Sequence, residues 1–244
     1  MTLIQKEVTK VYLWTTQVRP AWWGGWQPDA NTIAWYPLDS TNTINDKSWN
    51  GYNLTNSWIT FGTNWWVDCA NMTSSVYAYS TNIPLPSWNN ARTISYWFYN
   101  TSVIGDTYYL GYGSQNYGQF FAPCVSGSNH WFFMGYGSTS NYDYYTSLQL
   151  TTGSWWLYTI TMWDWYLKFY YNWNLVDSVS WRTYNTTAVG STWKLTVWCR
   201  LSTWAQPEKY INWYMSNLIF ENAAWTAQEI SDYYDLTKWD YWIS

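Results

Sequence analysis

Short runs of apolar and aromatic residues alternate with polar turn clusters along most of this chain. From residue 32 onward, runs rich in β-branched and aromatic side chains are separated by Asn, Ser, Gly and Pro. Such runs are typical of β-strands. We expect strands within 91–99, 131–136, 157–162, 168–177 and 210–220. Many short strands at this spacing favour an all-β fold in which two sheets pack face to face.

One segment near the C-terminus has a helical pattern instead. Thr226 and Glu229 have the spacing of a capping box, in which each side chain bonds the other residue's backbone amide. Ile230, Tyr233 and Tyr234 then fall on one helical face. We therefore expect a short helix that packs near the end of the sandwich. No repeat of fixed period is visible, which disfavours a solenoid or a propeller.

Trp stands at several positions where a tight turn calls for Gly. In 168–177, two strand-like runs flank Asn172-Trp173, and the second central residue of such a turn should have positive φ, as in Asn-Gly. A Trp with positive φ would be strained. The chain of 244 residues has 25 Trp and 13 Gly, and its Gly content lies below the usual share of about 7%.

From this we infer that many of these Trp are UGA codons that the source organism reads as Gly, through an alternative genetic code. The candidates are Trp14, Trp49, Trp58, Trp65, Trp66, Trp88, Trp163, Trp165, Trp173, Trp193, Trp198, Trp204, Trp213, Trp239 and Trp242. Trp35, Trp97, Trp131 and Trp225 lie in apolar or aromatic runs and are interpreted as true Trp, while Trp22, Trp23, Trp26, Trp155, Trp156 and Trp181 stay undecided. The alternative is an aromatic-rich binding protein in which all Trp are native.

Charge and hydropathy exclude several classes of partner. Charged residues make up 11% and the net charge is −4, which argues against nucleic acid and against an anionic membrane surface. The N-terminus lacks the apolar core of a signal peptide, and no run approaches the roughly eighteen apolar residues of a membrane span. If the protein works outside a cell, we expect it to leave by another route, such as lysis as part of a virion.

The chain divides into two parts. Residues 1–30 are predicted to be an N-terminal attachment segment and linker, and residues 31–244 the sandwich domain. The three Cys are widely spaced without a C-x-x-C pair, which disfavours a disulfide framework or a zinc site. Buried small hydrophobes are the favoured interpretation for Cys69 and Cys199. A bridge between these two remains an alternative.

Several segments, taken in order, resemble one known family. The matching pieces are 33–39 with 45–54, then 92–98, 157–161 leading into 167–176, and 211–230. Together they resemble the laminin G-like branch of the concanavalin A-like lectin and glucanase superfamily over about residues 32 to 235. In that family, Gly is expected at the positions of Trp49, Trp165, Trp173 and Trp213.

The resemblance implies an antiparallel jelly-roll β-sandwich with one short C-terminal helix. Such domains bind sugars or protein surfaces, often with one calcium ion. The leader around residues 9–20 resembles the opening of phage structural proteins that carry such a domain. It implies a virion or tail-associated protein, located on the virion or an extracellular surface, whose N-terminal segment contacts other virion proteins.

Calcium would need six to eight oxygen ligands. The resemblance points to Asp39, Asp46 and Asn50 as ligands near the first strands. Asp46 and Asn50 could equally form turns by bonding their own backbone. Ser216-Asn217 stands where relatives often have an Asp-Glu pair, and this weakens the calcium prediction.

Sugar binding needs an aromatic platform beside polar side chains that read the hydroxyls. The loop-like segments 112–119 and 136–145 combine Tyr with Gln, Asn and Asp. Within them, Tyr117, Tyr142 and Asp143 are the candidate ligand-binding residues. Both segments could also be ordinary solvated loops.

An enzyme is disfavoured. Glycosidases need two carboxylates across the scissile bond, and the Glu-x-Asp-x-Glu strand of the family's glycosidases is absent here. His130, the single His, lies at a loop-to-strand junction, where a structural role is favoured over a general base. We expect a non-enzymatic lectin-like module that binds a host surface glycan or other cell-surface ligand. The alternatives are a structural protein that self-associates as a homo-oligomer or decorates a shell, and a glycan hydrolase.

Overall fold

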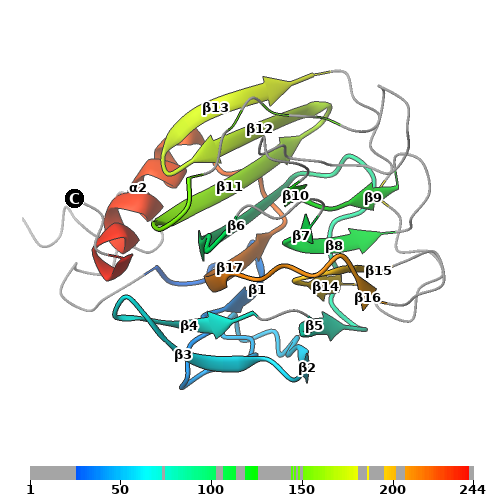
Figure 1. The fold of residues 1–244 in the computed structure, drawn as a ribbon. Helices are drawn as coiled ribbons and strands as arrows, with labels where there is room; N and C mark the ends of the chain where they lie inside the picture. The colour runs from blue at the N-terminus through cyan, green and yellow to red at the C-terminus, as the bar shows by residue number, and fades with distance from the viewer. Residues whose placement is uncertain are drawn as a thin grey trace, which may run out of the picture.

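The protein is an antiparallel jelly-roll β-sandwich with one short C-terminal helix, as predicted (Figure 1). A computed structural model describes residues 26–72, 75–102, 107–113, 119–125, 144, 146, 148, 151–180, 186, 195–201 and 207–241. All strand pairs in these ranges are antiparallel. Within them, no helix is long and apolar enough to cross a membrane.

The large sheet has eight strands. Its order is β13-β12-β11-β6-β17-β4-β3, and β1 also pairs with β17. The bounds are β1 Thr32–Tyr36, β3 Thr60–Asn64, β4 Val67–Asn71, β6 Arg92–Tyr99, β11 Trp155–Trp163, β12 Tyr166–Tyr171, β13 Asn174–Val179 and β17 Tyr214–Glu221.

The small sheet has five strands in the order β2-β5-β14-β8-β9. Its strands are β2 Thr55–Ser57, β5 Tyr77–Ser80, β8 Leu110–Gly113, β9 Phe120–Phe121 and β14 Leu195–Val197. Two further pairs join β7 Thr107–Tyr108 to β10 Cys124–Val125 and β15 Arg200–Leu201 to β16 Pro207–Glu208.

Strand β6 explains why the large sheet needs cover on both faces. All eight of its residues are buried. Since successive strand side chains point to opposite faces, Ile94, Tyr96 and Phe98 join the core between the two sheets. Trp97 and Tyr99 join a second apolar cluster on the outer face. An aromatic strand of this kind can lie only in the middle of three layers.

The helix supplies that third layer. Helix α2 (Ala227–Thr237) begins with the predicted capping box between Thr226 and Glu229, and it buries Ile230, Tyr233 and Tyr234. It covers the outer face of the large sheet, and its Tyr234 ring also contacts Trp173 at the β12–β13 turn, with centroids 4.7 Å apart. The outer side chains of β6 and β11, among them Trp97, Trp155 and Leu157, form an apolar surface that the helix buries.

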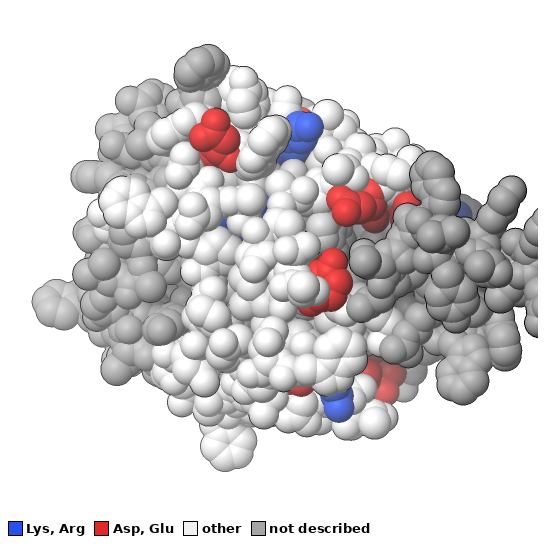
Figure 2. All heavy atoms as spheres, turned by 180° about the vertical axis from the view of Figure 1, so that it is seen from behind, with Lys and Arg blue, Asp and Glu red and all other residues white. Residues whose placement is uncertain are grey.

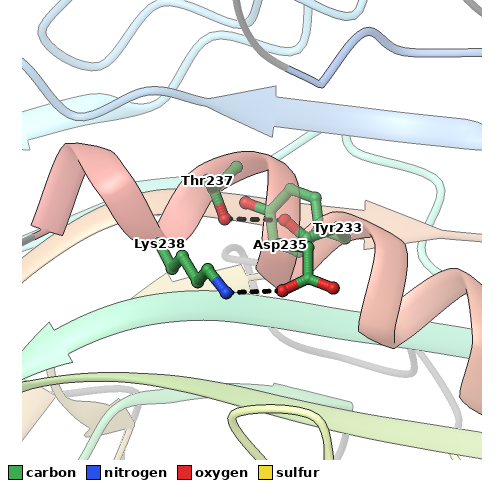
Figure 3. A network of polar contacts seen from close by, with 4 residues as sticks. All are labelled: Tyr233, Asp235, Thr237 and Lys238. Atoms are coloured by element: carbon green, nitrogen blue, oxygen red, sulfur yellow. Dashed lines mark hydrogen bonds and ion pairs between the residues drawn. The ribbon is translucent and has the colours of Figure 1, made fainter. Parts of the chain in front are cut away.

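The end of the helix is held by short-range polar contacts (Figure 3). Thr237 Oγ1 donates to the carbonyl of Tyr233 at 2.8 Å, and Lys238 Nζ pairs with Asp235 Oδ1 at 2.7 Å. The 3₁₀ turn η2 (Lys238–Tyr241) follows and brings the Tyr241 ring onto Trp97, with centroids 4.0 Å apart. This stacking adds to the area that the helix buries.

A bulge in β17 reverses the side-chain alternation halfway along the strand. The register with β6 shifts between Ser216 and Ile219, and Asn217 has φ of +50°. Asn is among the residues that tolerate this conformation. The Asn217 side chain accepts from Trp35 Nε1 and donates to the Tyr241 hydroxyl, so it ties β1 to η2 across the strand.

Several Trp candidates for Gly positions have left-handed backbone. Positive φ values between +49° and +73° occur at Trp49, Trp58, Trp65, Trp66, Trp88 and Trp198. Such values are uncommon outside Gly and costly for a bulky side chain. The described Trp that were interpreted as native or left undecided, Trp26, Trp35, Trp97, Trp155, Trp156 and Trp225, all lack positive φ. Positive φ therefore occurs only among the Gly candidates, but five other described candidates, Trp163, Trp165, Trp173, Trp213 and Trp239, lack it.

Two hairpins differ from the prediction. At the β12–β13 turn the positive φ belongs to Asn172 at +57°, and at the β11–β12 turn to Asp164 at +55°. The expectation of positive φ at Trp173 is therefore wrong. The turn places the left-handed residue first, and Asn and Asp bear that conformation at low cost. Trp163, Trp165 and Trp239 also lack positive φ, although their side chains are exposed.

Among the described Trp candidates for Gly positions, Trp213 has the surroundings least suited to Gly. Its ring is 1% exposed, its φ is not positive, and its indole N–H donates to the Ser102 carbonyl at 2.8 Å. The ring packs on Phe98 and Tyr109, with centroids 6.1 and 5.2 Å away. The expected Gly position at 213 is thus filled by a packed core side chain. Trp198 is also fully buried, but on left-handed backbone.

The cysteines are free and buried, as the favoured interpretation predicted. The alternative bridge between Cys69 and Cys199 is wrong, because Cys69 belongs to β4 in the large sheet and Cys199 follows β14 in the small sheet. Burial raises the pKa of the Cys69 thiol to about 12, which keeps it protonated and unreactive.

Glu221 is a buried carboxyl at the end of β17. It is 2% exposed, and its Oε1 accepts from Thr32 Oγ1 at 2.7 Å. Burial raises the pKa of Glu221 to about 8; Asp29 and Glu229 add to this effect, and the Thr32 bond opposes it. The folded protein therefore keeps this proton to a higher pH than the unfolded chain does.

This difference makes stability fall with pH. Between about pH 4.5 and 8 the unfolded chain loses the Glu221 proton while the folded chain retains it, so the free energy of unfolding decreases as pH rises. We expect Glu221→Gln to flatten this slope and to raise Tm at pH 8 relative to the parent by about 3 °C or more. Thermal melts followed by circular dichroism check this. At pH 4 both proteins are neutral at residue 221, and an equal slope in both would contradict the prediction.

Candidate functional site

The predicted metal ligands Asp46 and Asn50 organise the loop after β1. Asp46 Oδ1 accepts from the amides of Trp35 and Ser48, and its Oδ2 accepts from Ser48 Oγ and the Tyr52 amide. Asn50 Nδ2 donates to the carbonyls of Thr32 and Ile33 at 2.8 and 3.1 Å. Both residues therefore hold the loop of residues 45–54 onto β1.

Asp39 lies in a separate turn. Its Oδ1 accepts from the amides of Thr41 and Asn42, and both of its oxygens accept from Asn42 Nδ2. No contact joins Asp39 to Asp46 or Asn50 in the described ranges. In the structure, N–H and O–H donors point at the Asp39 and Asp46 oxygens, and calcium at Asp39, Asp46 and Asn50 stays a prediction from the sequence. The described residues also contain no group of three His, Cys, Asp or Glu that could hold a metal.

The three candidate ligand-binding residues, Tyr117, Tyr142 and Asp143, lie outside the described residues, and so does His130. Their roles stay predictions from the sequence.

The structure points instead to a small cavity beside the small sheet. The cavity has a volume of about 60 Å³ and is lined by Ile83, Pro84, Leu85, Pro86, Ser87, Tyr112, Gly113 and Thr186. One wall is therefore the proline-rich loop before β6, and the other comes from the end of β8 and from Thr186. Pro fixes the backbone φ of this loop, which keeps the wall in place without a ligand. Pro84 is exposed, so the cavity lies at the protein surface.

Gly113 makes the close approach at the cavity possible. Its φ is +93°, and a Cβ there would meet the Gln119 carbonyl oxygen at 2.2 Å and Thr186 Cγ2 at 3.0 Å. No other residue fits that position. The missing side chain thus leaves room for Thr186 to lie beside β8.

Arg92, the first residue of β6, lies behind the cavity and is 1% exposed. Its Nη1 donates to the Tyr112 hydroxyl at 2.8 Å and to Thr186 Oγ1 at 3.1 Å. Its Nη2 donates to the carbonyls of Ser87 and Trp88, and Nε donates to the Asn90 carbonyl at 3.0 Å. All of its hydrogen-bond donors are therefore used, and every acceptor is neutral.

The rings of Tyr112 and Phe121 flank the guanidinium, with Cζ 5.9 and 5.4 Å from the two centroids. These rings attract a cation electrostatically. Burial raises the pKa of the Tyr112 phenol, and the Arg92 charge and hydrogen bond partly oppose this. Arg92 thus joins β6 of the large sheet to β8 of the small sheet and to the loop wall.

Sequence reasoning missed this site. One signal was present, because Arg92 is the only charged residue in an otherwise apolar, aromatic and hydroxylated strand of eight residues. A charged residue in a fully buried strand needs partners. What the pattern could not supply was Thr186, which is 94 residues away in the chain.

Charge on the rest of the surface is sparse. Figure 2 shows one face on which isolated Asp and Glu are scattered among uncharged residues, with few Lys or Arg. Among the residues described on that face, no cluster of basic side chains appears.

No family model and no curated protein matches the chain by sequence. Solved structures do match the fold. Domain 4 of AbnA, a GH43 extracellular arabinanase from Geobacillus stearothermophilus in complex with arabinotriose, is 18% identical with a TM-score of 0.65. The match covers 83% of this chain and 98% of that domain.

Toxin domains are also similar. The binding domain of Paraclostridial Mosquitocidal Protein 1 is 16% identical with a TM-score of 0.64, and that of botulinum neurotoxin serotype D is 16% identical with a TM-score of 0.59. The chain matches 52% and 50% of their lengths, and 84% of its own. At these identities the likeness shows a β-sandwich of the kind found in carbohydrate-binding and receptor-binding domains.

The role of Arg92 as a tie between the sheets can be measured. Arg92→Lys keeps the charge but cannot reach all five oxygens that the planar guanidinium bonds. We expect it to lower the free energy of unfolding by about 2 kcal/mol or more, because buried acceptors lose their donors. Urea denaturation checks this. Lys168→Arg, an exposed exchange on β12, is the matched control, and a loss below about 0.5 kcal/mol for Arg92→Lys would contradict the assignment.

Proposed function

We propose that the protein is a non-enzymatic, lectin-like module that binds glycans on a host cell surface. The observation that carries this proposal is the cavity beside β8, which is lined both by the hydroxyl-bearing residues Tyr112 and Thr186 and by the apolar residues Ile83 and Leu85. A substituent of a sugar that enters a cavity of about 60 Å³ needs both kinds of contact, because it carries polar atoms on an apolar carbon framework, while the ring itself stays outside.

The similar structures support a binding role. Domain 4 of AbnA was solved with arabinotriose, and the toxin domains of the same fold are binding domains. For botulinum neurotoxin type C, cell entry depends upon interaction with two ganglioside molecules. Fold alone does not determine function, so the cavity and not the likeness carries the proposal.

The setting is a phage virion or tail, with the sandwich displayed outward and the N-terminal segment of residues 1–30 contacting virion proteins. The support for this is the resemblance of the leader around residues 9–20 to the opening of phage structural proteins that carry a laminin G-like domain.

Binding can be tested on immobilised glycans. We expect the purified protein to retain a subset of neutral and acidic glycans on an array without releasing any cleaved product. Hydrolysis of a bound oligosaccharide would contradict the non-enzymatic part of the proposal. Failure to retain any glycan, with self-association in ultracentrifugation, would favour a structural, shell-decorating role instead.

We also propose that many of the Trp are Gly in the source organism, by reassigned UGA codons. The support is the backbone at Trp49, Trp58, Trp65, Trp66, Trp88 and Trp198, where positive φ suits Gly and disfavours Trp. Most of these side chains project into solvent; Trp58 and Trp66, for example, are 84% and 83% exposed. They therefore add strain without adding core packing.

Replacing such a residue tests the idea directly. We expect Trp66→Gly to raise the free energy of unfolding by about 1 kcal/mol, because it relieves the left-handed strain and removes an exposed ring. Trp97→Gly is the matched control and should cost several kcal/mol, since that ring is buried under the helix. Denaturant melts give both values. UGG codons at the positive-φ positions in the coding DNA would overturn the reassignment.

A further inference from the structure

Among the residues that the structure describes, no carboxylate bonds Arg92. Its hydrogen-bond acceptors are two hydroxyls and three carbonyls. Buried charges in proteins are usually paired, because removing an ion from water is costly. The neutral oxygens satisfy the donors of Arg92 but leave a net positive charge behind the cavity.

The charge of Arg92 polarises the two hydroxyls that accept its hydrogen bonds. Tyr112 and Thr186 both accept from Nη1 of Arg92, so each must direct its own hydrogen elsewhere. Neither hydroxyl has an acceptor for that hydrogen in the described part of the chain. Both residues line the cavity. Two O–H donors polarised by one cation therefore belong to buried residues that line the cavity, a pattern suited to an oxygen pair with negative charge.

The size and the lining residues of the cavity further restrict the chemical class of ligand that it can bind. A volume of about 60 Å³ admits a group of a few heavy atoms and excludes a sugar ring. The apolar side chains of Ile83 and Leu85 and the rings of Pro84 and Pro86 lower the local dielectric, which strengthens a charge interaction there. A planar carboxylate at the edge of a larger molecule meets these conditions.

We propose that this cavity binds the carboxylate of an acidic sugar, with the two carboxylate oxygens accepting from Tyr112 and Thr186 and the sugar ring lying outside against the proline-rich loop. The proposal rests on the glycan-binding function above and specifies its substrate class. Arg92 acts as a positioning residue, since it orients both hydroxyls and supplies the positive charge without contacting the ligand.

Calorimetric titration with methyl β-D-glucuronide and methyl β-D-glucoside tests this, because the two probes differ only by the carboxylate. We expect the glucuronide to bind at least about tenfold more tightly, as a hydrogen-bonded charge contributes that much. Tyr112→Phe keeps the ring stacked on Phe121 and removes the hydroxyl. It should weaken glucuronide binding by about tenfold, and Thr186→Val should do the same. Tyr166→Phe, exposed on β12, is the matched control.

The outcomes separate this proposal from the proposed function. Glycan binding with equal affinity for both probes, or binding insensitive to Tyr112→Phe in a protein that folds normally by circular dichroism, would overturn the carboxylate site and leave the lectin-like function standing. Acetate binding that Tyr112→Phe abolishes, without binding of any glycan, would support the carboxylate site and overturn the glycan function. Tighter binding of inorganic phosphate than of acetate would overturn the choice of carboxylate.

Discussion

The need to satisfy a buried guanidinium organises the region where the two sheets meet. Arg92 begins the central strand β6, and its donors reach a residue of the small sheet, a residue from a distant loop and three backbone carbonyls. Each of these acceptors must be in place for the arginine to be buried at low cost. The same requirement fixes the walls of the cavity, so stability of the sandwich and shape of the candidate site depend on one side chain.

The aromatic content of the chain fits a three-layer arrangement. β6 sends Tyr96 and Phe98 toward the small sheet, while Trp97 faces Tyr234 of α2 and Tyr241 of η2. Helix α2 is therefore a structural part of the domain, since without it the outer cluster would face water. The bulge at Asn217 lets one strand, β17, serve both clusters and hold the ends of β1 and η2.

The candidate site illustrates where prediction from the sequence stops. The sequence marked Asp46 and Asn50 as residues with a special role, but side chains that can bind a metal can also stabilise a turn. In the structure, Asp46 accepts from backbone amides and Asn50 donates to backbone carbonyls. The cavity was not anticipated, because Ile83, Tyr112 and Thr186 have no common periodicity. Only Arg92, a charge inside a buried strand, offered a local signal. The turn at Asn172-Trp173 was predicted as a turn, but which residue takes positive φ depends on the strand twist on each side.

What this sequence determines by itself is local: alternating aromatic runs specify strands, Thr226 and Glu229 start the helix, and the turn positions of many Trp reveal where the backbone needs left-handed residues. These follow from interactions between residues close in the chain. The tertiary structure decides the rest, namely that α2 covers a sheet face, that Trp213 is a core side chain, and that Arg92 meets Thr186. Burial and buried polar pairing join residues far apart in the chain, so they exist only once the two sheets have packed.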